Sequence, residues 1–253
     1  MIPKILHFCW LSGDPYPPKI AKCLKSWEKH LPDYEIMLWD TNRFDLNSSI
    51  WVKQAYEKKK YAFAADYIRF YALYHYGGVY LDSDVEVLKD FGDFLDLPYF
   101  IGAEKAQTPE AAIIGAEKGC DWIKQCLDYY HDRSFIKEDD SLDIKKLPEI
   151  MVEQIQKLKP IRVLSLEDSL NIRKLNMRRE VLEFNDVFFS PKVFDSREVE
   201  LTPYTYAVHH YQNSWFSPRA KVYYRSRAFF VKLFGIQFVR KVERLLIPWK
   251  FKQ

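Results

Sequence analysis

Residues 61–88 read YAFAADYIRFYALYHYGGVYLDSDVEVL, and this stretch decides the fold that we expect. Its first half is typical of a helix that carries Asp66 and Arg69. Two glycines then break the helix, and a short apolar run predicts a strand that ends at the acidic triplet 82–84. Open α/β sheets bind ligands at the carboxyl ends of their strands, so the triplet marks a candidate binding site.

Asp82 and Asp84 are candidate metal ligands. Residues two apart in an extended segment project to the same side, so the two carboxylates face one small volume. They repel each other there unless a cation or a proton intervenes, and a hard divalent ion such as Mn²⁺ or Mg²⁺ prefers oxygen ligands of this kind. The alternative is a surface turn that carries two acids.

Asp66 and Arg69 are three residues apart and therefore share one helical face, among small alanines that let other groups approach. The guanidinium offers a fixed fork of donors for sugar hydroxyls or a phosphate. An ion pair within the helix is the alternative for these two residues, and the pattern alone does not decide between the two.

His209 and His210 are candidate third ligands near the other end of the chain. Adjacent residues on a strand point to opposite faces, so at most one of them joins the acidic pair. Histidine suits Mn²⁺ better than Mg²⁺. The alternative is that one histidine packs in the core while the other is solvated.

The rest of the chain predicts a single α/β domain with a mixed, mainly parallel sheet, because strands and helices alternate through the first sixty residues. We expect strands at residues 4–10, 34–39, 79–81, 99–103, 111–116, 181–184, 187–189 and 204–210. We expect helices around residues 18–30, from Ser48 or Ser49 to Lys60, and at 61–76, 120–130 and 147–158. At 253 residues the chain is long enough for one sizeable core and short for two.

The charge is divided unevenly along the chain. Residues 217–253 contain ten Lys or Arg and one acid, a net charge of +9, which leaves 28 basic and 34 acidic residues, a net −6, for residues 1–216. Apolar and basic residues interleave in this tail, as in an amphipathic helix at a membrane surface, with a break near Gly235. Docking onto the body or onto an acidic partner is the alternative, and the acidic body argues against nucleic acid.

The sequence predicts a cytoplasmic protein. Its four cysteines form no CxxC pair, the amino-terminal apolar run is too short and interrupted for a signal peptide, and no apolar run approaches the roughly 18 to 20 residues that span a bilayer. With the basic tail included, we expect peripheral contact with the inner face of the cytoplasmic membrane.

As an ordered set, these patterns resemble the family-32 glycosyltransferases, the group with a DXD sugar-binding region that includes bacterial capsular polysaccharide transferases and fungal mannosyltransferases. They are more distantly similar to the clostridial glucosylating toxins. The matching motifs are residues 2–10, Ser26-Trp27, 32–35, 38–40, 62–88, 188–191, His209-His210 and Ser214-Trp215. The resemblance covers residues 1–216 and implies a GT-A fold, the Rossmann-like fold of nucleotide-sugar transferases.

The resemblance also implies roles for individual residues. Trp10 stacks on the nucleotide base, and Asp66 with Arg69 holds hydroxyls of the donor sugar. The implied catalytic residues are Asp66, Arg69, Asp82 and Asp84; the implied metal ligands are Asp82, Asp84, His209 and His210; and the implied nucleotide-sugar contacts are Phe8, Trp10, Tyr80, Asp82, Ser83, Asn213, Ser214 and Trp215. Ala111-Ala112 stands where the family often has an asparagine, which removes one expected donor-site hydrogen bond.

The expected function is therefore metal-dependent, retaining transfer of a hexosyl or N-acetylhexosaminyl group from a nucleotide-sugar, a UDP-sugar by family habit, to a hydroxyl of a glycan or lipid-linked glycan. Synthesis of bacterial capsule, O-antigen or another surface polysaccharide is the expected setting. One alternative is a phosphohydrolase of the haloacid dehalogenase type, which also opens on a strand followed by DxD. Another is a non-catalytic glycan-binding protein with a structural cation.

Overall fold

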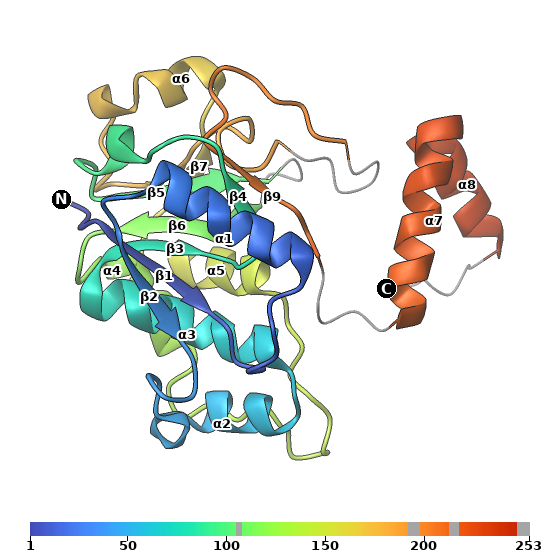
Figure 1. Ribbon diagram of the computed structural model, residues 1–253, viewed down its shortest axis with the longest axis horizontal. Coiled ribbons are helices and arrows are strands. Elements are labelled where there is room, and N and C mark those ends of the chain that lie inside the picture. The colour runs from blue at the N-terminus through green and yellow to red at the C-terminus, as the bar shows by residue number, and fades with distance from the viewer. Residues whose placement is uncertain (105–107, 192–197, 213–217, 247–253) are drawn as a thin grey trace.

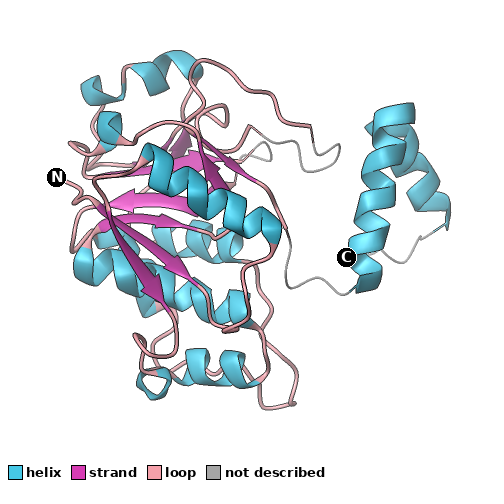
Figure 2. Ribbon diagram, in the orientation of Figure 1, coloured by secondary structure: helices cyan, strands magenta, loops and turns pink. Residues whose placement is uncertain are grey.

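The computed structural model describes residues 1–104, 108–191, 198–212 and 218–246 (Figure 1). Its centre is a five-stranded sheet in the order β2-β1-β3-β6-β5. The strands are β1 (Ile5–Cys9), β2 (Glu35–Trp39), β3 (Gly78–Leu81), β5 (Tyr99–Ala103) and β6 (Pro109–Ala116). Figure 2 shows them gathered in the middle of the body with helices around them.

The sheet is mixed, as predicted, but only one half of it is parallel. β1 runs parallel to β2 and β3, whereas β6 runs antiparallel to both β3 and β5. The short connection between β5 and β6 leaves no room for a helical crossover, and consecutive strands joined so closely pair antiparallel. The expectation of a mainly parallel sheet therefore holds only for the β2-β1-β3 half.

Three helices in the first part of the chain lie close to the positions that the sequence predicts. α1 (Pro18–His30) begins with a proline in its first turn and ends before Pro32. α2 (Ile50–Glu57) is capped by Ser49, whose side chain accepts a hydrogen bond from the amide of Val52 at 3.3 Å. α3 (Tyr61–Tyr76) then brings Asp66 and Arg69 to the sheet.

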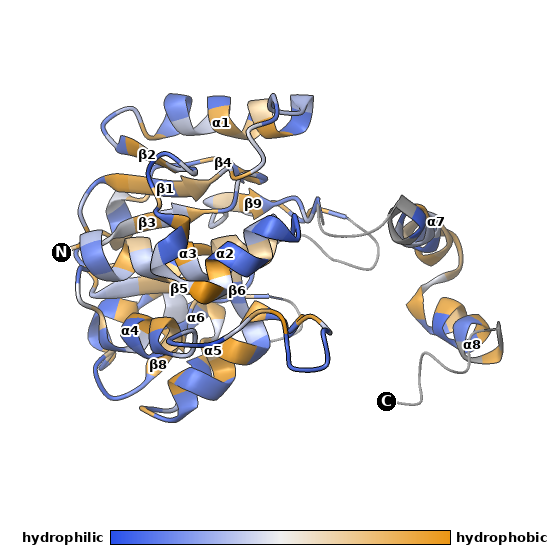
Figure 3. Cartoon of the chain, turned by 90° about the horizontal axis from the view of Figure 1, so that it is seen from below, coloured by the Kyte–Doolittle hydropathy of each residue, from blue (hydrophilic) through white to orange (hydrophobic). Residues whose placement is uncertain are grey.

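The helices cover both faces of the sheet. α1 lies over one face, and α3, α4 (Asp121–Asp128) and α5 (Leu147–Gln156) lie over the other (Figure 3). Shorter described elements are η1 (Leu46–Ser48), η2 (Gly92–Phe94), α6 (Leu166–Leu170), η3 (Ile172–Lys174), and the parallel strands β7 (Ile161–Val163) and β8 (Val181–Glu183). The sheet thus forms the middle of three layers (Figure 3).

The glycine pair after α3 is required by the close approach of β3 to β1. Gly78 has a φ of +110°, and a Cβ there would lie 2.5 Å from the carbonyl oxygen of Ile5. Gly77 has a φ of +69° and ends α3. Only glycine adopts these conformations without strain, so the pair fixes how the chain enters β3 and where the acidic triplet lies.

β4 (Val85–Val87) directly follows the acidic triplet and leaves the main sheet. It pairs antiparallel with β9 (Ala207–His209) in a separate two-stranded sheet. The sequence did not predict β4 as a strand, because three residues are too few to show a period.

The predicted strand at residues 187–189 is wrong. This segment is a turn, in which the amide of Phe188 donates to the carbonyl of Asn185 and the amide of Ser190 donates to the carbonyl of Asp186. Phe188 and Phe189 are nevertheless buried, and they pack against Phe94. The large apolar residues of this segment therefore reflect burial in an aromatic cluster rather than strand geometry.

Two helices, α7 (Pro218–Phe234) and α8 (Ile236–Leu246), follow the body and turn at Gly235, whose φ is +78°. They pack on each other, with Glu243 of α8 buried against Arg227 of α7 at 2.8 Å. No helix in the described part of the chain is both long and apolar enough to cross a membrane. All four cysteines are free thiols.

Candidate active site

The site lies at the edge of the sheet where β1 and β3 end. These strands are adjacent and parallel, with Leu6 opposite Val79 and His7 opposite Tyr80. Trp10 follows the end of β1 and Asp82 follows the end of β3. Neighbouring strands lie about 4.8 Å apart, so the parallel register brings both residues to one edge.

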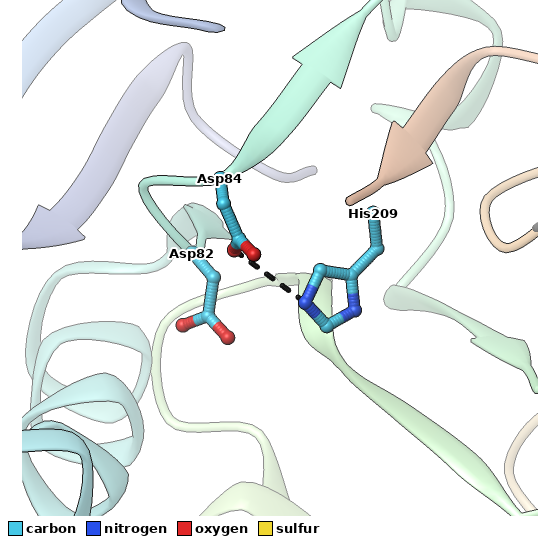
Figure 4. A group of neighbouring side chains, drawn as sticks. All are labelled: Asp82, Asp84 and His209. Atoms are coloured by element: carbon cyan, nitrogen blue, oxygen red, sulfur yellow. Dashed lines mark ion pairs between the residues drawn. The ribbon is translucent and has the colours of Figure 1, made fainter. Parts of the chain in front are cut away.

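Three side chains at this edge form a group that is suited to a metal ion (Figure 4). A ligand atom from each of Asp82, Asp84 and His209 lies within 4.8 Å of the others. His209 arrives through the β4–β9 ladder, which places it opposite Val85, the residue after Asp84. Two carboxylates and one imidazole are a donor set that Mn²⁺ accepts well and Mg²⁺ tolerates, so the residues fit a divalent cation.

Asp84 is held as an anion by its surroundings. Its Oδ2 accepts a hydrogen bond from the amide of Gln212 at 2.7 Å, and its Oδ1 lies 3.4 Å from Nε2 of His209. Although burial opposes the charged form, His209 and the Gln212 amide lower the pKa of Asp84 to about 2. Burial also opposes the charge on His209, yet Glu110 and Asp84 raise its pKa well above the ordinary value. The negative charges of Glu110 and Asp84 thus favour a positive charge at the position of His209.

Arg69 joins the helix to the acidic triplet. Its Nη2 lies 3.1 Å from Oδ1 of Asp66 and 3.2 Å from Oδ1 of Asp82, and its Nη1 donates to the carbonyl oxygen of Ala111. The guanidinium also lies 4.6 Å from the ring centre of Tyr80, whose hydroxyl donates to Asp82 at 3.1 Å. Most of the donors of this buried side chain are engaged within the protein, so its clear role in this geometry is to orient Asp82 and Asp66.

Asp66 is nearly buried, and burial raises its pKa to about 7 in spite of the neighbouring Arg69. Burial likewise raises the pKa of Asp82. Arg69 contacts both carboxylates, so it connects Asp66 on α3 with Asp82 at the end of β3.

His210 lies outside the metal-ligand group. Its Nε2 is 2.8 Å from Glu86 Oε2, and the other oxygen of Glu86 is 2.8 Å from Lys22. The two histidines thus contact different acids, His209 with Asp84 and Glu110, and His210 with Glu86. Of the two candidates that the sequence left open, the structure brings only His209 to Asp82 and Asp84.

A pocket of about 440 Å³ opens next to the ends of β1 and β2, and none of the three residues of the metal-ligand group lines it. Its lining includes Trp10, Asp14, Tyr16, Asp40 and Asn42. The indole of Trp10 donates from Nε1 to the carbonyl of Asp14 at 2.7 Å, and its ring centre is 5.0 Å from that of Tyr16. The pocket offers a fixed aromatic face of the kind that a flat heterocycle stacks on.

The other residues predicted to contact the nucleotide-sugar are Phe8, Ser83, Asn213, Ser214 and Trp215. Phe8 is buried under α1, with its ring centre 5.2 Å from that of Trp27, and it does not line the pocket. Ser83 lies between the two acids in the turn, where the amide of Val85 donates to the carbonyl of Asp82. Asn213, Ser214 and Trp215 lie outside the described residues.

One residue of the site was missed by sequence reasoning. Glu110 on β6 is almost fully buried, and its carboxylate lies 3.2 Å from Nδ1 of His209. An acid within a run of apolar strand residues, PEAAIIGA, was the available signal.

The family described as "Glycosyltransferase sugar-binding region containing DXD motif" matches residues 17–106, a range that includes α3, β3 and the acidic triplet. Residues 17–106 are therefore similar to the sugar-binding region of the DXD glycosyltransferases. The mixed α/β sheet agrees with the GT-A fold that the resemblance implied. His209 and Glu110 lie beyond the matched range, and the structure brings both of them close to the acidic triplet.

Two relatives illustrate the match. An uncharacterized glycosyltransferase of Acanthamoeba polyphaga mimivirus is 28% identical over 188 residues, 70% of this chain and 75% of that protein. Inositol phosphoceramide mannosyltransferase 3 of Schizosaccharomyces pombe is 30% identical over 130 residues, half of this chain and 36% of that protein. This chain thus spans most of the first relative but only about a third of the second.

Among solved structures, the PaToxG glycosyltransferase superposes with a TM-score of 0.45 at 20% identity, covering 68% of this chain and 74% of that one. The similarity to the DXD glycosyltransferases is seen in the sequence matches and does not depend on this superposition.

Proposed function

We propose that this protein is a metal-dependent, retaining glycosyltransferase that moves a sugar from a nucleotide-sugar to a hydroxyl of a glycan acceptor. One observation carries the proposal: the Asp82, Asp84 and His209 group lies at the same sheet edge as the aromatic pocket at Trp10. A nucleoside diphosphate has a flat base at one end and a charged diphosphate at the other, and this edge offers a partner for each.

Each part of the site has a role in this proposal. Trp10 stacks on the base, and the acidic group holds Mn²⁺ or Mg²⁺, which when bound would neutralise charge on the leaving diphosphate. Arg69 keeps Asp82 in place through its bond of 3.2 Å, and the Gln212 amide keeps Asp84 in place. Transfer with retention is proposed from the resemblance to the family.

For the donor we propose a UDP-sugar, and for the acceptor a growing glycan on a lipid, as in the synthesis of capsule, O-antigen or another surface polysaccharide. A lipid acceptor is also suggested by the relative named as an inositol phosphoceramide mannosyltransferase. That name makes GDP-mannose the donor to compare with UDP-sugars.

A thermal-shift panel of UDP- and GDP-sugars, with Mn²⁺ and with a chelator, tests the donor. We expect a stabilising shift with one donor class only when Mn²⁺ is present, and Mn²⁺-dependent release of the matching nucleoside diphosphate. Asp84→Ala should abolish both effects. Shifts that persist in Asp84→Ala would place the metal elsewhere, and release of phosphate from phosphate esters would favour a phosphohydrolase.

The helices α7 and α8 support a second part of the proposal, contact with an anionic membrane surface. Hydrophobic residues occur along both helices (Figure 3). The large ones that are exposed are Val222, Phe229, Phe230, Leu233, Phe234, Phe238 and Leu245. Exposed basic residues accompany them, among them Arg225, Arg240 and Lys241. Apolar insertion together with attraction to acidic headgroups is how amphipathic helices bind at a membrane surface, and it would place the enzyme at the inner face of the cytoplasmic membrane.

Flotation with phosphatidylglycerol vesicles and phosphatidylcholine vesicles tests this contact. We expect binding to the anionic vesicles that falls with salt, and weaker binding for Phe229→Ser/Leu233→Ser. Ile144→Ser is the matched control, because Ile144 is an equally exposed apolar residue of the body. If both variants bind as the wild type does, or if the wild type is dimeric and floats with neither vesicle, the membrane proposal fails.

A further inference from the structure

Glu110 is a buried acid that the roles described so far leave without a function. It lies at the start of β6, with 1% of its surface exposed. Burying a carboxylate is costly unless its oxygens are hydrogen-bonded. Here Oε1 accepts from the amide of Ala112 at 3.0 Å, and Oε2 accepts from the hydroxyl of Tyr211 at 3.3 Å. The carboxylate is therefore held in one orientation by groups on two separate strand regions.

In this orientation the carboxylate of Glu110 faces His209. Oε1 of Glu110 lies 3.2 Å from Nδ1 of the imidazole, while Nε2 on the opposite side of the ring faces Asp84. The ring of Tyr211 covers the imidazole, with the ring centres 4.0 Å apart. The imidazole thus has one nitrogen engaged with Glu110 and the other directed into the acidic group.

The same short segment of β6 also supports the rest of the site. The carbonyl of Ala111 accepts from Arg69, and the carbonyl of Ala112 accepts from the amide of Asp82 at 2.9 Å. Three consecutive residues therefore contact the histidine, the arginine and the first aspartate of the site. A shift of Glu110 relative to these carbonyls would move His209 relative to Asp82.

We infer that Glu110 is a positioning residue that orients His209 for a divalent cation by accepting the Nδ1 hydrogen and leaving the Nε2 lone pair to the ion. This inference rests on the proposed metal site. Histidines that bind metals commonly donate their second ring nitrogen to a carboxylate, and loss of that partner typically costs about 10- to 100-fold in metal affinity. Glu110 acts through His209 and does not itself touch the ion.

Titration of the full chain with Mn²⁺, followed by the electron paramagnetic resonance signal of the free ion, tests the inference without any turnover. We expect the Kd for Mn²⁺ to rise about 10- to 100-fold in Glu110→Gln, which keeps the shape of the side chain and removes its charge. Glu86→Gln is the matched control, because Glu86 contacts His210 at 2.8 Å outside the metal-ligand group. The control should bind Mn²⁺ as the wild type does.

A double-mutant cycle separates positioning from a general loss of negative charge. If Glu110 acts through the imidazole of His209, Glu110→Gln should cause little further loss of Mn²⁺ affinity in a His209→Ala background. Equal losses in both backgrounds would overturn the inference, as would unchanged affinity in Glu110→Gln with a wild-type melting temperature. A wild-type chain that binds no Mn²⁺ would instead refute the proposed metal site, so the two failures are distinguishable.

Discussion

The indole of Trp27 donates a hydrogen bond from Nε1 to the carbonyl oxygen of Val85, at 2.8 Å. Ser26, the preceding residue, accepts a hydrogen bond from the amide of Val87 at 2.9 Å. These two bonds attach α1 to the strand that follows the acidic triplet. Since Val85 also pairs with His209, α1 supports the strand that follows Asp84 and, through it, the strand that carries His209.

Trp27→Phe should weaken the site as well as the fold. It leaves the buried carbonyl of Val85 without its donor, which costs about 1–3 kcal/mol of unfolding free energy, and it loosens the strand beside Asp84. We expect a lower midpoint in urea and a higher Kd for Mn²⁺. Trp51→Phe is the control: Trp51 is as buried and donates to Phe63 at 2.7 Å, remote from the triplet. Equal Mn²⁺ affinity in the two variants would contradict the prediction.

The two histidines should differ sharply when each is replaced. His209→Ala removes one of the three proposed ligands and should reduce the affinity for Mn²⁺ and the rate of nucleotide release together. His210→Ala removes a contact with Glu86 and should leave the affinity for Mn²⁺ within about twofold of the wild type. Calorimetric titration of both variants checks this, and the reverse order would assign the ligand to His210.

Arg69→Met should destabilise the folded protein strongly. The variant leaves Asp66 and Asp82 without the cation that holds both, and removal of one partner from a buried ion pair costs about 3–5 kcal/mol. Denaturant unfolding at pH 7 measures the loss. Arg69→Lys retains a charge but not the fork that reaches both carboxylates, so we expect it to fall between the wild type and Arg69→Met. A loss below about 1 kcal/mol in Arg69→Met would show that the pair is not held as described.

Glu183 should give the protein a pH-dependent stability. The side chain on β8 is fully buried, and neither of its oxygens has a hydrogen-bond partner among the described residues. Burial raises its pKa from 4.5 to about 8. The folded state therefore retains a proton that the unfolded state releases, so this contribution to stability is complete below pH 4.5 and is lost as the pH rises to about 8.

Glu183→Gln removes that dependence, because the amide is neutral at every pH. We expect the variant to gain stability over the wild type as the pH rises, with a gain roughly 3 kcal/mol larger at pH 8.5 than at pH 5.5. Urea unfolding at the two pH values checks this. A gain that is the same at both pH values would mean that Glu183 is charged throughout.

The sequence predicts the first half of the fold well because its signals are local. Alternating strands and helices, the cap at Ser49 and the glycine pair at the end of α3 are each determined by neighbouring residues. The acidic pair and its placement after β3 follow from the same local pattern. These features give the position of the site and two of the three residues in its metal-ligand group.

The remaining features of the fold and the site depend on contacts between residues that are far apart in the sequence. The choice between His209 and His210 is set by the register of β9 against β4, two strands of three residues each, and such short strands carry no period. Glu110 contacts His209 only because β6 and β9 meet at the same edge. The error at residues 187–189 has a similar cause, since Phe188 and Phe189 are apolar for packing and not for strand pairing.

The pairing of β4 with β9 also sets an order of events during synthesis. Domains begin to fold from the amino terminus while the ribosome is still extending the chain, so the acidic pair emerges long before His209. Until β9 arrives, β4 has an unpaired edge and the site lacks one of its proposed ligands. A nascent chain that stops short of β9 would therefore carry the whole family-matched region and yet bind Mn²⁺ poorly, which makes tight Mn²⁺ binding a marker of completed folding.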